Sequence, residues 1–251
     1  ENRMGEFDGR VVVVTGGGLG LGEAFSRGFA AAGAQVVVAD IADEAANQVA
    51  EEINGLAVHT DVSDESSTKA MAQAAHEKFG RIDILINNAA LWTAILPMKP
   101  WDEIPVEEWD RVMAVNVKGY FLAARAVFPY MKKNKWGRII NLSSNTALSG
   151  VPGILHYVTS KGAAIGLTRA LAREIGSAGI TVNAITPGLT STEGVKAHYS
   201  NEMLESRITA RSVQRQQQPE DLVGTVMFLA SDRAEFITGQ TVNIDGGQLM
   251  H

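Results

Sequence analysis

The chain has 251 residues, of which 45% are hydrophobic and 20% are charged, as is usual for a globular protein. Its net charge of −6 argues against a nucleic-acid-binding surface, which is basic, and the absence of cysteine excludes disulfides and thiolate chemistry. No apolar run approaches the ~20 residues that a membrane-spanning helix needs, and Glu1–Met4 lacks the apolar core of a signal peptide. We therefore expect a cytoplasmic protein with no membrane or nucleic-acid partner.

The first predicted elements form a β–α–β unit. Four consecutive valines, Val11–Val14, predict a strand that is buried on both faces. The glycine-rich turn 16–22 and an apolar helix ending at Gly33 follow, and a second strand at 36–39 runs into Asp40. Backbone N–H groups at such a turn bind a pyrophosphate, and an acid after the second strand binds ribose hydroxyls. The unit therefore predicts a dinucleotide site.

Asp40 also predicts which dinucleotide binds. Its carboxylate would repel the 2′-phosphate of NADP, and no Arg or Lys stands at Gly17, Gly18 or Ile41 to offset that charge. We therefore expect NAD as the cofactor. The alternative is that Asp40 is only a solvated turn residue.

Strands and helices continue to alternate up to the end of the chain. The apolar pattern predicts further strands at 56–59, 82–86, 138–142, 180–185 and 241–244. It predicts helices at 43–54, 63–79 with Ser63 as N-cap, 105–117, 121–133, 157–175 and 221–230, with an irregular loop at 91–104. Seven strands in this alternation predict a single domain over 1–251, an α/β Rossmann-type doubly wound parallel sheet with helices on both faces. A polar segment, 189–218, interrupts the pattern and is expected to form a lid over the substrate.

Candidate site residues follow the predicted strands. They are the glycine turn, Asp40, Asp61, Asn88, Ser144 and Pro187. Ligands of such sheets bind beyond the carboxyl ends of the strands, so these residues are expected to meet there. Asp61 is expected to hydrogen-bond the adenine, with Val62 as an apolar wall, and the alternative is that Asp61 only caps the next helix.

Tyr157 and Lys161 are four residues apart, which on a helix puts both side chains on one face, about 6 Å apart along the axis. A phenol titrates near pH ~10, and a neighbouring ammonium lowers that pKa. Lys161, helped by a cationic cofactor, is expected to make Tyr157 a usable base. The alternative is an ordinary helical pair.

Two more polar residues lie in predicted helices. Asn116 is unfavourable in the middle of a helix, so we expect it to hold a water beside Lys161, unless it simply faces solvent. His156, beside Tyr157, is expected at the surface or the pocket rim. The other histidines are scattered, and no metal site is predicted.

Taken together, these motifs resemble the classical short-chain dehydrogenase/reductase family over essentially the whole chain. The matching elements are Thr15–Gly22, Asp61-Val62, Asn87–Ala89, Asn116, Ser144, Tyr157-x-x-x-Lys161, Pro187–Thr192 and Ile237–Gly247. One mild departure is Ala90, where the family usually has glycine. The resemblance implies an oxidoreductase and a homotetramer.

The resemblance also implies roles for single residues. Tyr157 would be the general base in oxidation and the acid in reduction, and Lys161 would lower its pKa and hold the nicotinamide ribose. Ser144 would hydrogen-bond the substrate oxygen, Asn116 would position a water in a proton relay, and Thr192 would bind the nicotinamide carboxamide. The implied cofactor site comprises Gly16, Leu19, Gly20, Leu21, Gly22, Asp40, Asp61, Val62, Asn88, Ala89, Tyr157, Lys161, Pro187, Gly188, Thr190 and Thr192.

The substrate is indicated less directly. Residues 187–197 and the end Leu249–His251 resemble bacterial 1-arylethanol, cyclic-alcohol and pyridoxal dehydrogenases. The predicted pocket residues Leu91, Trp92, Thr146, Leu148 and Leu189 are mostly apolar, which favours a hydrophobic aryl or alicyclic secondary alcohol or ketone. The alternatives are a pyridoxal-type alcohol dehydrogenase, an NADPH-dependent 3-oxoacyl thioester reductase, and a dinucleotide-binding sensor without chemistry.

Overall fold

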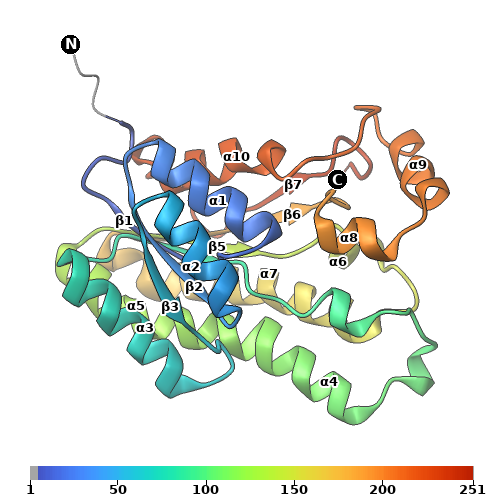
Figure 1. Ribbon diagram of the computed structural model, residues 1–251, viewed down its shortest axis with the longest axis horizontal. Coiled ribbons are helices and arrows are strands. Elements are labelled where there is room, and N and C mark those ends of the chain that lie inside the picture. Colours follow the sequence, from blue (N-terminus) through green and yellow to red (C-terminus); the bar gives the residue numbers. More distant parts are fainter. Residues whose placement is uncertain (1–4, 251) are drawn as a thin grey trace.

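Seven parallel strands form one sheet in the computed structural model, which describes residues 5–250 (Figure 1). The strands are β1 (Val11–Thr15), β2 (Gln35–Asp40), β3 (Leu56–His59), β4 (Ile84–Asn87), β5 (Gly137–Leu142), β6 (Ile180–Pro187) and β7 (Thr241–Ile244). Their order across the sheet is β3-β2-β1-β4-β5-β6-β7. All seven predicted strands and the doubly wound topology are confirmed.

Helices cover both faces of the sheet (Figure 1). One layer consists of α1 (Gly20–Ala31), α2 (Asp43–Glu52) and α10 (Glu220–Ala230), and the other of α3 (Glu65–Phe79), α5 (Gly119–Asn134) and α7 (Leu155–Ile175). In β1, Val12 and Val14 pack into the first layer, whereas Val11 and Val13 pack into the second. A strand buried on both faces has no polar face, which explains its all-valine sequence.

Two helix boundaries differ from the prediction. α4 (Val106–Met113) passes through a π-helical segment, Ala114–Lys118, directly into α5 without leaving helical backbone angles. The predicted break before 121 is therefore wrong, because the extra residue of the π turn is absorbed inside one long helix. Asp64, rather than Ser63, caps α3: its carboxylate accepts from the backbone N–H groups of Ser66 and Ser67.

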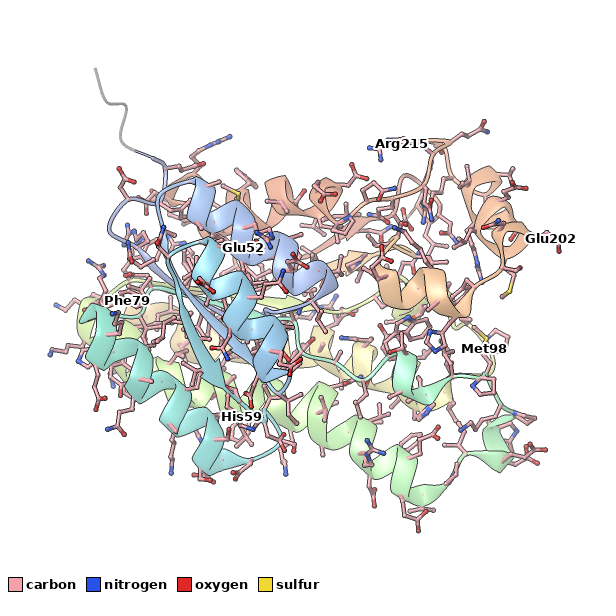
Figure 2. The ribbon with its side chains drawn as sticks, viewed as in Figure 1. Glu52, His59, Phe79, Met98, Glu202 and Arg215 are labelled. Atoms are coloured by element: carbon pink, nitrogen blue, oxygen red, sulfur yellow. The ribbon has the colours of Figure 1, made fainter. Side chains whose placement is uncertain are left out.

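The polar segment 189–218 contains two helices that the sequence did not predict, α8 (Glu193–His198) and α9 (Asn201–Thr209). Hydroxyl caps start both, because Thr192 accepts from the Val195 N–H and Ser200 from the Met203 N–H, each at 3.3 Å. In Figure 2, Met98 of the 91–104 loop and Glu202 of α9 lie at the end of the molecule opposite Phe79, the last residue of α3. The loop and α8–α9 thus share one end of the fold.

Among residues 5–250, no helix is both long and apolar enough to cross a membrane. The predictions that concern Glu1–Met4 and His251 fall outside the described residues.

Candidate active site

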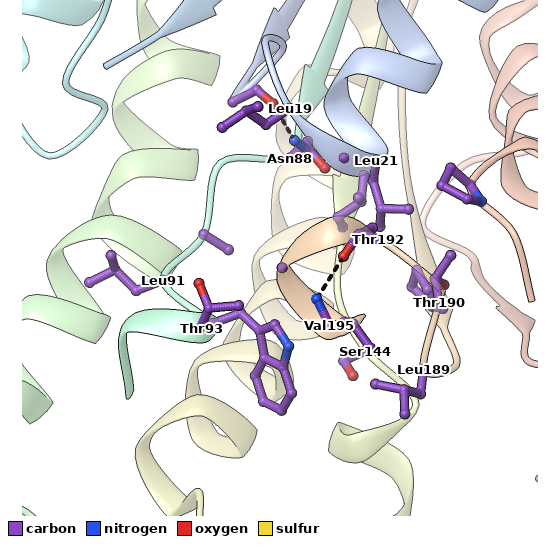
Figure 3. Close-up of a pocket in the computed structure, with 18 of the residues that line it drawn as sticks. Leu19, Leu21, Asn88, Leu91, Thr93, Ser144, Leu189, Thr190, Thr192 and Val195 are labelled. Carbon is purple, nitrogen blue, oxygen red and sulfur yellow. Dashed lines mark hydrogen bonds between the residues drawn. The ribbon is translucent and has the colours of Figure 1, made fainter. Parts of the chain in front are cut away.

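One cavity of about 970 Å³ runs along the carboxyl ends of the strands (Figure 3). Its wall combines the glycine turn, the residues after β2 to β6, the start of α7 and the α8–α9 segment. The topology accounts for this, because β1 lies between β2 and β4, where the strand order reverses and a crevice opens.

Nearly all of the predicted cofactor residues line this cavity. They are Gly16, Leu19, Gly20, Leu21, Asp40, Asp61, Val62, Asn88, Ala89, Tyr157, Lys161, Pro187, Gly188, Thr190 and Thr192. Gly22 is not among the lining residues: a Cβ there would overlap the carbonyl oxygen of Gly16, so glycine lets the start of α1 approach the turn closely. Its contact with the cofactor stays a prediction.

Asp40 is a fixed anion in the cavity wall. Its side chain accepts hydrogen bonds from the Gly18 N–H at 2.9 Å and the Ala42 N–H at 3.0 Å, and the residue is only 8% exposed. The alternative of a solvated turn residue is wrong. Each carboxylate oxygen keeps a lone pair for a further donor, such as a ribose hydroxyl.

The side chains of Asn88 and Asp61 form hydrogen bonds that hold two backbone turns in the cavity wall. The Asn88 amide donates to the carbonyl oxygens of Gly16 at 2.9 Å and Thr15 at 3.0 Å, which fixes the glycine turn (Figure 3). Asp61 Oδ1 accepts from the N–H and the hydroxyl of Ser63 at 2.8 and 2.7 Å. Asp61 therefore shapes the turn before α3 while it also lines the cavity.

Tyr157 and Lys161 lie on the same side of α7, as their spacing predicts. Lys161 Nζ is 5.6 Å from the centroid of the Tyr157 ring. The ammonium donates to the Leu142 carbonyl at 2.8 Å and to the Tyr120 hydroxyl at 3.1 Å. Lys161 is 2% exposed, so these bonds hold it in one position below the Tyr157 ring.

Burial dominates the electrostatics of this pair. It raises the pKa of Tyr157 well above its usual value, against a hydrogen bond with Ser144 that lowers it, and Tyr199 raises it further. Burial also lowers the pKa of Lys161 to about 7. Burial and Ser144, rather than Lys161, are the main causes that shift the pKa of Tyr157 in the cofactor-free protein, so its expected lowering by Lys161 together with a cationic cofactor stays a prediction.

Ser144, directly after β5, lines the cavity. Its Oγ accepts from the Thr146 N–H at 3.2 Å and from the Thr146 hydroxyl at 2.9 Å. Because both bonds use Ser144 as the acceptor, its own hydroxyl proton remains for the hydrogen bond with Tyr157 that lowers the pKa of that phenol.

Asn116 is buried in the π-helical segment and does not line the cavity. Its Oδ1 accepts from the Leu91 N–H at 2.8 Å, and its Nδ2 donates to the Leu91 carbonyl at 3.3 Å and to Ser160 Oγ at 3.1 Å. The solvent-facing alternative is wrong. Asn116 fastens the loop after β4 to α7, and its role in a water relay stays a prediction.

His156 is fully buried, so its expected place at the surface or rim is wrong. Its Nε2 lies 2.8 Å from Glu108 Oε1, and Lys99 Nζ donates to the other Glu108 oxygen at 2.6 Å. These contacts join α4, the 91–104 loop and the first turn of α7. α4 and the 91–104 loop cover the imidazole. The sequence does not predict that these two elements lie beside α7.

The substrate end of the cavity is mostly as predicted. Leu91, Trp92, Thr146 and Leu189 line it, whereas Leu148 is 39% exposed and lies outside, so that prediction is wrong. Leu148 lies in the short helix α6 (Thr146–Ser149).

Tyr199 is a cavity residue that sequence reasoning missed. Its ring stacks on Trp92 with centroids 6.5 Å apart, and Trp92 in turn lies 4.7 Å from the Tyr157 ring. Tyr199 sits between α8 and α9 in a polar stretch with no motif to mark it. Three aromatic rings thus extend from the Tyr157 side chain to the segment 189–218.

Comparison with known proteins agrees with this geometry. A family model described as enoyl-(acyl carrier protein) reductase matches residues 17–248. The meso-2,3-butanediol dehydrogenase of Serratia marcescens is 37% identical over 244 residues, which are 96% of this chain and 95% of the relative. The chain belongs to the short-chain dehydrogenase/reductase family.

Other members of the short-chain dehydrogenase/reductase family show the same likeness. The 3-oxoacyl-(acyl-carrier-protein) reductase of Thermotoga maritima is 35% identical over 245 residues, 96% of this chain and 98% of the relative. A solved structure of the 3-ketoacyl-(acyl-carrier-protein) reductase from Brucella melitensis, complexed with NADH, has a TM-score of 0.89 at 34% identity. The likeness covers 97% of this chain and 99% of that one. This chain is therefore an oxidoreductase of that family with a site for a nicotinamide cofactor.

The residues of the cavity fit such a cofactor. Gly16 and Gly20 have positive φ angles of 62° and 56°, which only glycine adopts readily, so the backbone of the turn forms the wall at the N-terminus of α1 without side chains. The fixed Asp40 lines the same cavity as Tyr157, Lys161 and Thr192. This arrangement suits a phosphate-bridged ligand with a ribose beside Asp40.

Proposed function

We propose that the protein is an NAD-dependent dehydrogenase that interconverts a hydrophobic aryl or alicyclic secondary alcohol and its ketone. The observation that carries this proposal is the single cavity in which Asp40, the Ser144–Tyr157–Lys161 group and an aromatic wall converge. The narrower likeness to 1-arylethanol, cyclic-alcohol and pyridoxal dehydrogenases supports the same substrate class.

Asp40 supports NAD over NADP. Its carboxylate would accept hydrogen bonds from the adenosine ribose hydroxyls and repel a 2′-phosphate in the same place. Leu19, Gly20 and Leu21 would present backbone N–H groups to the pyrophosphate at the start of α1. Thr192 would hold the nicotinamide carboxamide, and Lys161 the nicotinamide ribose.

The chemistry of the residues follows from the pKa values. NAD⁺, when bound, would supply a hydride acceptor and a second positive charge. That charge and the Lys161 ammonium together would favour the Tyr157 phenolate, which the protein groups alone do not. In oxidation Tyr157 would take the proton of the alcohol, and in reduction it would return that proton to the substrate oxygen. Ser144 donates its hydroxyl proton to the substrate oxygen and stabilises the charge that develops there.

The wall beside Tyr157 supports the substrate class. Trp92 and Tyr199 stack there, and Leu91, Val151, Ile154 and Leu189 add apolar surface. Burying about 100 Å² of a substrate ring against such a wall contributes roughly 2.5 kcal/mol at ~25 cal/mol per Å². A ring is therefore favoured over a small diol.

A 3-oxoacyl thioester reductase is the second candidate. The family model and the Thermotoga relative, both described as reductases of acyl-carrier-protein substrates, favour it. It would be expected to prefer NADPH, which the carboxylate of Asp40 opposes.

The assembly, the lid and the compartment are also proposals. Phe121 on α5 and Leu155 on α7 are exposed at 46% and 43%, and these apolar side chains support a homotetramer in which α5 and α7 pack against their mates. The segment 189–218, with α8 and α9, would close over the bound substrate. A cytoplasmic location fits the absence of cysteine.

A substrate comparison tests the proposal. With NAD, kcat/KM for 1-phenylethanol and cyclohexanol should exceed that for 2,3-butanediol by about 10- to 100-fold, the factor expected from the buried ring area. Trp92→Ala should lower the aryl-to-butanediol ratio by about tenfold, since it removes part of the wall. Leu148→Ala, an exposed residue outside the cavity, is the matched control and should leave the ratio unchanged. A 3-oxoacyl thioester reduced faster than any ketone tested, with NADPH preferred, would replace this proposal by the second candidate.

A further inference from the structure

Lys161 is a buried amine without a carboxylate partner among the described residues. Within residues 5–250 no Asp or Glu forms an ion pair with it, and its side-chain bonds go to two neutral oxygens, the Leu142 carbonyl and the Tyr120 hydroxyl. A buried ammonium needs such acceptors to stay charged, because burial alone favours its neutral form.

Tyr120 is built to accept from Lys161. It lies in the first turn of α5, directly after the π-helical segment, and is 1% exposed. Its hydroxyl donates its only proton to the Leu142 carbonyl at 2.8 Å, so the oxygen presents lone pairs to Lys161 Nζ at 3.1 Å. Its ring centroid lies 5.3 Å from the same Nζ.

The Tyr120 hydroxyl is held in its neutral form. Burial raises its pKa well above the usual value, and the neighbouring Tyr157 raises it further. Its proton stays on the bond to the Leu142 carbonyl, so the oxygen acts towards Lys161 as a neutral acceptor. The backbone carbonyl of Tyr120 accepts from Asn87 Nδ2 at 3.2 Å, which adds to the rigidity of this turn.

We propose that Tyr120 is a positioning residue that keeps the Lys161 side chain charged and aimed at the Tyr157 ring. Lys161 Nζ lies near two aromatic rings, 5.3 Å from the centroid of the Tyr120 ring and 5.6 Å from that of Tyr157. The Tyr120 oxygen stabilises the charged amine directly, and its bond to Leu142 fixes the second acceptor. The inference rests on the proposed role of Lys161 in the reaction.

The test is a titration of Lys161 in the cofactor-free protein. Lysine labelled with ¹³C at Cε is followed by NMR against pH, and the Lys161 signal is assigned by its loss in Lys161→Met. Tyr120→Phe removes the acceptor but keeps the ring, so the pKa of Lys161 should fall by about one unit, a tenfold change in its protonation equilibrium. Turnover should fall by about tenfold as the charged form is depleted.

Tyr130→Phe is the matched control. Tyr130 lies on the same helix, where its ring packs on His76 with centroids 4.7 Å apart, and its hydroxyl makes no contact with Lys161. It should leave the titration of Lys161 and the turnover unchanged. If Tyr120→Phe does not fold, Tyr120→Met fills the site without a hydroxyl and should show the same shift.

Two results distinguish a failure of this inference from a failure of the proposed role of Lys161. A folded Tyr120 variant in which Lys161 titrates as in the wild type would overturn the inference. A Lys161→Met variant that retains turnover would instead contradict the proposed role of Lys161. The titration of the Tyr120 variants would still show whether the hydrogen bond from Lys161 to Tyr120 stabilises the charged amine.

Discussion

Lys161→Met is expected to abolish turnover and, at the same time, to make the protein more stable at pH 7. The catalytic loss should be about 10³-fold or more, because the cation that favours the Tyr157 phenolate is gone. The stability gain follows from desolvation, since burial lowers the pKa of Lys161 to about 7 in the folded chain. A methionine of similar length leaves no buried charge, and the Leu142 carbonyl keeps the hydrogen bond from Tyr120.

The pH dependence of this gain has a defined sign. Between about pH 7 and the ordinary lysine value near 10.4, the unfolded chain binds a proton that the folded chain does not. The stability of the wild type is therefore highest above that window and falls as the pH is lowered through it. At pH 7 Lys161→Met should be more stable by about 1–3 kcal/mol, or roughly 2–4 °C in Tm for each kcal/mol, and the gain should shrink towards pH ~10.5.

Thermal unfolding of the wild type and Lys161→Met at pH 7 and pH 10 provides the measurement. Lys133→Met, the same substitution at an exposed position of α5, should change the free energy of unfolding by less than about 0.5 kcal/mol. A Lys161→Met protein that is less stable than the wild type at pH 7 would show that the ammonium is well solvated or well paired, contrary to this account.

Asp40 is expected to control the choice of cofactor. The wild type should favour NAD over NADP by about 100-fold or more in kcat/KM, equivalent to roughly 2.7 kcal/mol, because the fixed carboxylate repels the 2′-phosphate. The double variant Asp40→Ser/Ile41→Arg removes that charge and adds a cation at a residue that is 63% exposed and lines the same wall. Its preference should shift towards NADP by about 10²- to 10³-fold.

Steady-state kinetics with both cofactors measures this shift. Asp43→Ser is the control, since Asp43 is an exposed acid three residues away that pairs with His59 and does not line the cavity. It should keep the wild-type preference. Equal use of NAD and NADP by the wild type would remove the basis for assigning the cofactor from Asp40.

The fold was predictable because its signals are local and repeated. The valines of β1 and the glycine turn that follows identify the β–α–β unit without any long-range information. The residues after each strand then fall at one edge, since parallel strands put their carboxyl ends on the same side. The π-helical segment was not predictable, because it depends on Asn116 reaching Leu91 and Ser160, which lie on other elements.

The candidate site residues could be predicted from the sequence, whereas the residues packed around them could not. Tyr120 and Tyr199 carry no sequence motif, and only the packing of α5 and of the segment 189–218 brings them to Lys161 and Trp92. The pKa shifts were also out of reach, because a spacing of four residues indicates proximity but not burial. α8 and α9 had readable signals, since Thr192 and Ser200 are hydroxyl residues at the starts of the helices they cap.

The assignment of Tyr157 as the proton-exchanging group is best tested with Tyr157→Phe, with NAD binding and turnover measured on the same preparation. We expect the Kd for NAD to stay within about threefold of the wild type. We expect kcat for the alcohol to fall by about 10³-fold or more, because only the proton-accepting hydroxyl is removed. A kcat within tenfold of the wild type would contradict the assignment of Tyr157 as the group that exchanges the proton.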